Sequence, residues 1–124
     1  MMRCAVLILL SFFAFSCKKN GTGGEAKVQM TVKHHTWIVP YATIYIKYGA
    51  KTKPADLSPS AFNDHVQADA AGQAAFSNLR YGNYYIYSTG TDPYSGFSVH
   101  GGTYLTIKWK DRKSTLSLDV PVSE

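Results

Sequence analysis

The stretch DAAGQAAFSNLRYGNYYIY, residues 69–87, places two turns and two runs of strand-forming residues close together. Asp69 and Gly72 favour a tight turn, because Asp bonds to nearby backbone and Gly accepts a left-handed conformation. Gly82 favours a second turn, and the Tyr and Ile residues after it are typical of a strand. The stretch therefore predicts the order turn, strand, turn, strand.

Apolar and polar residues alternate along most of the chain after residue 26, as they do in half-buried strands. Residues 49–64 contain two prolines and no sustained period, which predicts a long loop with one helical turn. About seven short strands separated by turns predict one antiparallel β-sandwich. The expected strands cover residues 28–32, 42–46, 65–68, 73–77, 83–89, 104–109 and 116–122.

A recurring pattern of Asp-x-x-Gly, small-x-Phe-x-x-Leu and Gly-x-Tyr-x-Ile runs through the opening stretch. It is filled by Asp69, Gly72, Ala74, Phe76, Leu79, Gly82, Tyr84 and Ile86. Upstream, VPYATIYI supplies Pro-x-Ala-x-Ile-x-Ile, beginning at Pro40. Together these resemble the carboxypeptidase regulatory-like and Cna-B-type domains over most of residues 26–122. The resemblance implies an all-β, transthyretin-like (prealbumin-like) Greek-key sandwich.

The first residues have the composition of an export signal. Arg3 precedes an apolar run of about a dozen residues, which suits a signal peptide and is too short to span a membrane. Small residues then precede Cys17, which resembles the cleavage site of bacterial lipoproteins. We therefore expect a lipoprotein signal peptide at 1–16, a flexible Gly-rich tether at 17–25 and the sandwich domain at 26–124.

Lipidation of Cys17 would anchor the domain in a membrane and give this cysteine a role. The start CKKN, residues 17–20, resembles lipoproteins of the Bacteroidetes type, in which an acidic run after the cysteine is associated with export to the cell surface. The residues at this place are basic here, which favours the periplasmic side of the outer membrane. A surface-exposed or freely secreted product remains the alternative. Without the leader only one cysteine is left, so neither an internal disulfide nor a thiol metal site can form.

Catalytic, metal and nucleic-acid functions find little support in the sequence. The motifs GxSxG and HExxH are absent, so we expect neither an enzyme nor a cofactor. The four His residues have no carboxylate at ligand spacing and are expected to be solvated at strand ends, with no metal. The net charge of +5 is moderate and mixed in sign, which does not indicate nucleic-acid binding.

Some Cna-B-type domains form an internal Lys–Asn or Lys–Asp isopeptide bond, which requires inward-facing partners. Lys27, Lys33 and Asp119 are out of phase with the apolar residues of their strands, so we expect them to face solvent. The basic turn at residues 108–113 has two interpretations: contact with anionic head groups, or protection of an exposed edge.

Outward-facing aromatic residues are the main functional clue. Tyr85 and Tyr87 lie out of phase with the inward-facing Ile86, and Tyr41 and Tyr45 share one phase of a strand that is its neighbour in related sandwiches. Four Tyr rings would then form an exposed ladder that contacts an envelope protein. The alternatives are carbohydrate binding by the same rings, and cross-strand pairing that only stiffens the sheet.

Overall fold

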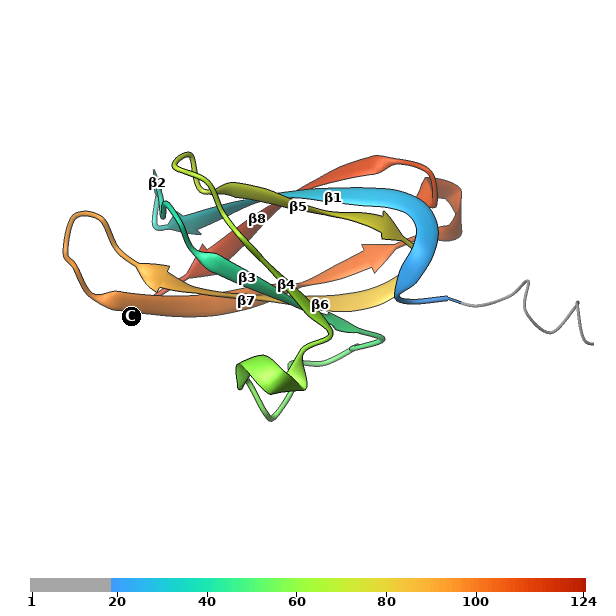
Figure 1. Cartoon of the computed structure of the whole chain (residues 1–124), viewed down its shortest axis with the longest axis horizontal. Helices are drawn as coiled ribbons and strands as arrows, with labels where there is room; N and C mark the ends of the chain where they lie inside the picture. The colour runs from blue at the N-terminus through green and yellow to red at the C-terminus, as the bar shows by residue number, and fades with distance from the viewer. Residues whose placement is uncertain (1–18) are drawn as a thin grey trace, which may run out of the picture.

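The computed structural model describes residues 19–124 as two four-stranded sheets packed face to face (Figure 1). The first sheet contains β1 (Thr22–His34), β2 (Trp37–Ile38), β5 (Gln73–Leu79) and β8 (Thr115–Val122). The second has the order β4 (Asp64–Gln67), β3 (Thr43–Tyr48), β6 (Gly82–Thr91) and β7 (Ser98–Ile107). The predicted all-β sandwich is confirmed.

One strand pair departs from the antiparallel pattern expected from the sequence. β8 pairs with β1 in parallel, whereas the other pairings of named strands are antiparallel. The reason is the connection after β7, which carries the chain to the opposite sheet rather than back along the same one. β8 therefore runs in the same direction as β1, the strand it joins.

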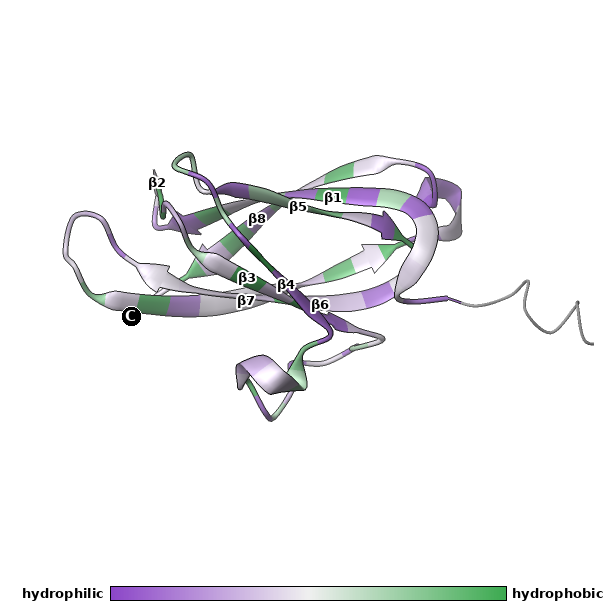
Figure 2. Ribbon diagram, viewed as in Figure 1, coloured by the Kyte–Doolittle hydropathy of each residue, from purple (hydrophilic) through white to green (hydrophobic). Residues whose placement is uncertain are grey.

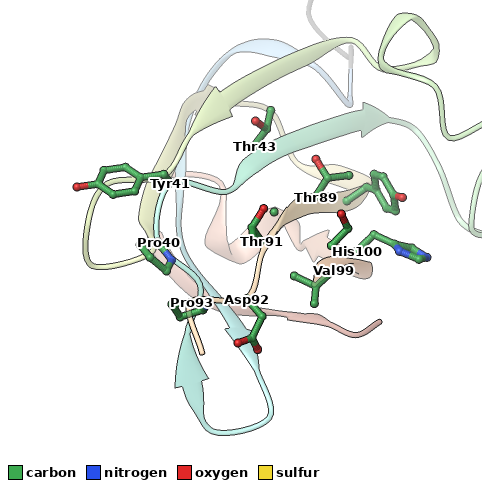
Figure 3. Close-up of a pocket in the computed structure, with 12 residues that line it drawn as sticks. Pro40, Tyr41, Thr43, Thr89, Thr91, Asp92, Pro93, Val99 and His100 are labelled. Atoms are coloured by element: carbon green, nitrogen blue, oxygen red, sulfur yellow. The ribbon is translucent and has the colours of Figure 1, made fainter. Parts of the chain in front are cut away.

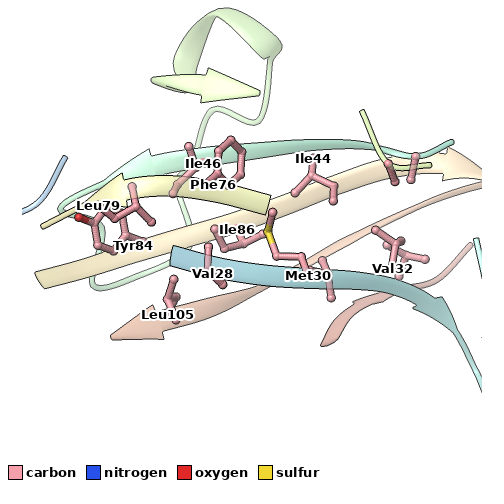
Figure 4. Close-up of a cluster of buried hydrophobic side chains, with 14 of the residues drawn as sticks. Val28, Met30, Val32, Ile44, Ile46, Phe76, Leu79, Tyr84, Ile86 and Leu105 are labelled. Carbon is pink, nitrogen blue, oxygen red and sulfur yellow. The ribbon is translucent and has the colours of Figure 1, made fainter. Parts of the chain in front are cut away.

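The core lies between the sheets and follows the predicted alternation (Figure 4). Val28, Met30 and Val32 of β1 are fully buried, and they face Ile44 and Ile46 of β3 across the interior. Colouring by hydropathy shows apolar and polar residues alternating along these strands (Figure 2). Other core members are Phe76, Leu79, Tyr84, Ile86, Leu105, Ile107, Val120 and Val122.

The folded domain begins earlier than expected. β1 starts at Thr22, and Asn20 already donates a backbone hydrogen bond to the Tyr81 carbonyl. The prediction of a flexible tether at 17–25 is therefore wrong for residues 20–25. Asn20 and Gly21 form hydrogen bonds at the start of β6, to the Asn83 N–H and the Tyr84 hydroxyl, and from Thr22 onward the chain pairs with β5. The signal peptide predicted at 1–16, and Cys17, lie outside the described residues.

Two connections differ in detail from expectation. The loop at 49–64 contains the predicted helical turn as a 3-10 turn at Pro59–Ala61, but the Ser58 side chain bonds to Asp56 and caps nothing. β7 begins at Ser98, well before the strand expected from residue 104. In residues 19–124, no helix is long and apolar enough to cross a membrane.

Candidate functional site

The outer face of the sheet β4-β3-β6-β7 carries the aromatic residues singled out in the sequence. In the strand register, Tyr45 lies opposite Tyr87 and Lys47 lies opposite Tyr85. Directly opposed residues of antiparallel strands share a face. Since Ile46 and its register partners occupy the core face, the outward phases predicted for these three Tyr residues are confirmed.

Two of these outward rings are nevertheless buried, which corrects the expectation of an exposed Tyr ladder. The exposed fraction is 4% for Tyr85 and 7% for Tyr87, against 61% for Tyr41. Phe62, from the loop between β3 and β4, stacks on Tyr87 with ring centroids 5.7 Å apart. The centroid of the Phe62 ring also lies 5.3 Å from that of the Tyr45 ring, and Tyr45 is half-buried. The long loop thus covers the centre of this face.

Tyr85 is buried because its ring extends over the neighbouring strand, where no side chain obstructs it. A Cβ atom at Gly102 of β7 would lie only 2.7 Å from the Tyr85 hydroxyl oxygen. Tyr104 flanks the ring, with centroids 5.1 Å apart. Burial raises the pKa of Tyr85, and the neighbouring phenols add to the effect. Tyr85 is therefore a neutral packing group rather than a contact residue.

An open groove of about 680 Å³ remains on this face, where β6 ends and β7 begins (Figure 3). Thr43, Thr89 and His100 are register partners across three strands, and Thr91 pairs with Ser98. Hydroxyl groups and one imidazole therefore line this part of the sheet, and the volume lies in the range of small-molecule sites. The remaining lining residues are Pro40, Tyr41, Tyr87, Gly90, Asp92, Pro93 and Val99.

Tyr41 lies on the side of the groove opposite His100 and differs from the other Tyr residues (Figure 3). It precedes β3 and has a left-handed backbone, with φ of 59°. This conformation costs a non-glycine residue about 1–2 kcal/mol. The backbone N–H of Tyr41 donates to the Asp69 carbonyl, which helps to hold this conformation. The result is one strained, exposed ring beside a polar groove.

Asp92 closes one end of the groove and is almost fully buried. Its carboxylate accepts hydrogen bonds from Nδ1 of His34, from Nε1 of Trp37 at 2.9 Å, and from the backbone N–H groups of Tyr94 and Ser95 at 2.7 and 2.9 Å. The bond from His34, helped by the other donors, holds the pKa of Asp92 well below its usual range. This network fixes the loop between β6 and β7.

The expectation that the four His residues are solvated is wrong for one of them. His34 is buried against Asp92, which lies 58 positions later in the chain, so no local pattern indicated the pairing. His35, His65 and His100 are exposed as predicted. Among residues 19–124, no group of three or more metal-binding side chains comes together.

Two further predictions concern the opposite sheet. Lys33 and Asp119 form an exposed ion pair with 3.4 Å between Nζ and Oδ2, and Lys27 is also exposed. Their predicted outward orientation is confirmed, so none of these side chains is placed for an internal isopeptide bond. Cys17, the predicted lipidation site, lies outside the part of the chain that the structure describes.

Comparison with known proteins gives structural neighbours but no family. No family model matches the chain, and no curated protein matches it. The major pilin subunit of Bacillus cereus superposes with a TM-score of 0.53 at 18% identity, over 83% of this chain. This chain spans 30% of the pilin, less than a third of its length.

A second neighbour is a Pseudomonas aeruginosa protein described as a "putative carbohydrate binding protein". It superposes with a TM-score of 0.54 at 12% identity, over 82% of this chain and 91% of its own. At such identities the two likenesses establish the fold alone. Both agree with the β-sandwich described above.

Proposed function

We propose that the protein is a non-catalytic, lipid-anchored binding module of the cell envelope, and that its groove binds a neutral saccharide. The supporting observation is a hydroxyl-lined groove beside the exposed ring of Tyr41. A flat ring offers apolar contact area at low entropy cost. Thr and Ser hydroxyls can donate to and accept from sugar hydroxyls. This combination is what a sugar ring requires.

The charge of the groove favours an uncharged ligand. Asp92 is its one acidic lining residue, and the carboxylate is already saturated by four donors. Among residues 19–124, no Lys or Arg lines it. An anionic ligand would find no fixed positive charge to pair with, and a cation would find no free carboxylate. Neutral hydroxyl groups need neither.

The same groups argue for binding rather than catalysis. A Thr or Ser nucleophile must lie within hydrogen-bond reach of a base. In the described residues, the hydroxyls of Thr43, Thr89 and Thr91 have no side-chain hydrogen bond to His100 or to a carboxylate. These three hydroxyls are therefore not activated as nucleophiles.

Attachment to the envelope through Cys17 is part of this proposal and rests on the sequence before residue 19. The lipidation motif supports a membrane anchor, and the basic residues after the cysteine favour the periplasmic side of the outer membrane. Under this arrangement the ligand would be a glycan of the cell envelope.

Contact with an envelope protein remains the second candidate, and the loops at one end of the sandwich favour it. Tyr94 and Phe97 are 77% and 61% exposed, and Trp37 packs edge-on against Tyr94 with centroids 5.3 Å apart. Exposed aromatic clusters of this kind mark protein contacts. Because Tyr85 and Tyr87 are buried, the surface that would make this protein contact is the loops rather than the sheet face.

A glycan array probed with the detergent-solubilised, full-length protein tests the proposal. We expect binding to neutral glycans, weakened about fivefold by Thr89→Val, since one lost hydrogen bond costs about 1 kcal/mol. Thr31→Val is the matched control, because it makes the same change on the outer face of the opposite sheet. No glycan binding, or equal losses from the two variants, would contradict the proposal.

A further inference from the structure

The chain enters the folded domain at one end of the sandwich and is fixed there. The backbone N–H of Asn20 donates to the Tyr81 carbonyl at 2.8 Å, and its side-chain oxygen accepts from the Asn83 N–H at 2.8 Å. The next residue, Gly21, donates its N–H to the buried Tyr84 hydroxyl at 2.9 Å. The position of residue 20 relative to the core is thus set by several bonds.

Only two residues separate Asn20 from Cys17, which limits how far the domain can stand from an anchor there. An extended chain spans at most about 3.6 Å per residue, so three steps reach about 11 Å. A flexible tether of residues 17–25, as expected from the sequence, would let the domain stand much farther from the anchor. A lipid on Cys17 would hold this end of the sandwich against the bilayer surface.

The same end carries the basic turn between β7 and β8, residues 108–114 (Figure 1). Within it, Trp109 is 60% exposed, and its ring packs edge-on against Tyr81 with centroids 5.0 Å apart. Tyr81 is also the residue whose carbonyl binds Asn20. The turn therefore lies beside the point where the chain enters the domain.

The charges of this turn are available to a partner. It contains four basic residues and one acidic residue, and Lys108, Lys110 and Lys113 are exposed. In the described part of the chain the two ion pairs are Lys33–Asp119 and His34–Asp92, neither of which involves the turn. Arg112 stacks over the Trp109 ring at 4.2 Å and helps to fix it.

We propose that this turn is a membrane-contact surface, which inserts Trp109 at the head-group level while its lysines pair with anionic lipids of the bilayer that holds the anchor. Trp favours the membrane interface, and each nearby Lys or Arg adds attraction to anionic lipid. The inference rests on the lipid anchor of the proposed function. It places the groove and the aromatic loops at the opposite end of the sandwich, facing away from the membrane (Figure 1).

Tryptophan fluorescence tests this orientation, because the chain has two Trp residues at opposite ends. The full-length, membrane-processed protein is reconstituted in vesicles of phosphatidylethanolamine and phosphatidylglycerol that contain a lipid spin-labelled at its head group. Trp37→Phe leaves Trp109 as the reporter, and Trp109→Phe leaves Trp37. We expect most Trp109 emission to be quenched and Trp37 emission to be nearly unchanged. Charge reversal at Lys108, Lys110 and Lys113 should reduce the quenching of Trp109.

A measurement on the unmodified chain guards against misfolding of the variants. Acetylation by an amine reagent should be slower at Lys108, Lys110 and Lys113 in these vesicles than in detergent, while Lys33 reacts equally in the two. If vesicles do not retain the protein, the anchor itself is wrong and the membrane contact fails with it. If the vesicles retain the protein but Trp109 and the three lysines are not protected, the lipid anchor is supported and the membrane-contact surface is overturned. An acidic protein as the partner of the turn would give this second result.

Discussion

Tyr84 is fully buried, and its hydroxyl group connects the start of the folded chain to the core. It accepts from the Gly21 N–H at 2.9 Å and donates to the Arg80 carbonyl at 2.7 Å. We expect Tyr84→Phe to lower the free energy of unfolding by about 1–3 kcal/mol, because it leaves a buried backbone N–H unpaired. Urea denaturation measures this change. Tyr104→Phe, at an exposed Tyr, should cost less than about 0.5 kcal/mol.

Tyr41 combines a strained backbone with an exposed ring, so stability and binding should respond to it in opposite directions. Asn tolerates the left-handed conformation, and little packing is lost with a ring that is 61% exposed. We expect Tyr41→Asn to raise the free energy of unfolding by about 0.5–1 kcal/mol while weakening glycan binding. A loss of stability greater than about 1 kcal/mol would mean that the ring is a packing residue.

Single residues also mark the limit of prediction from sequence. The inward orientation of Phe76, Tyr84 and Ile86 follows from alternation and turn residues alone, and the structure agrees. The burial of Tyr87 does not follow, because its cover is Phe62 from a loop with no periodic pattern. Alternation determines the face on which a side chain lies, whereas exposure depends on what the rest of the chain places over that face.

Among the connecting elements, the loop between β6 and β7 depends on Asp92. Its lowered pKa means that the folded state stabilises the ionised carboxylate. This contribution is fully present above the unfolded pKa of about 3.9 and is lost as the pH falls through the lower folded value. We therefore expect Asp92→Asn to destabilise the protein most at neutral pH, and the difference from wild type to narrow below about pH 4.

Urea denaturation of wild type and Asp92→Asn, from about pH 6 to about pH 2, measures that difference. Asp56→Asn is a suitable control, since Asp56 also has a lowered pKa but lies on the exposed loop and bonds only to Ser58. A difference between wild type and Asp92→Asn that stays constant with pH would show that the carboxylate does not stabilise the fold through its charge.

Strands with alternating apolar residues were predictable, and those shaped by distant partners were not. The first half of β7 contains Gly101 and Gly102, which resemble a turn in sequence. Gly102 instead leaves room for the Tyr85 ring, and a Cβ at Gly101 would collide with the Pro121 carbonyl. Residues 20–25 likewise resemble a linker, yet Asn20 and Gly21 form hydrogen bonds with Asn83 and Tyr84, 63 positions later in the chain. In these cases the contact that decides the structure lies far away in the chain.

At the scale of the whole molecule, the two ends of the sandwich have different surfaces. One end joins the chain entry to a basic turn with an exposed Trp, and the other carries the groove and the aromatic loops. We expect Cys17→Ala to move the protein from the membrane to the soluble fraction and to abolish labelling by a fatty-acid analogue. Unchanged fractionation of Cys17→Ala would show that Cys17 does not anchor the protein in the membrane.

The central claim, that the groove binds a neutral saccharide beside Tyr41, is tested most directly by comparing two exposed tyrosines on the same molecule. Tyr41 is at the groove, whereas Tyr104 is on the same sheet face outside it, and they are 61% and 53% exposed. The measurement is the glycan-array signal of full-length Tyr41→Ala and Tyr104→Ala against wild type. The account predicts that Tyr41→Ala loses most of the signal and Tyr104→Ala keeps it. Equal signals from the two variants, or loss only with Tyr104→Ala, would contradict it.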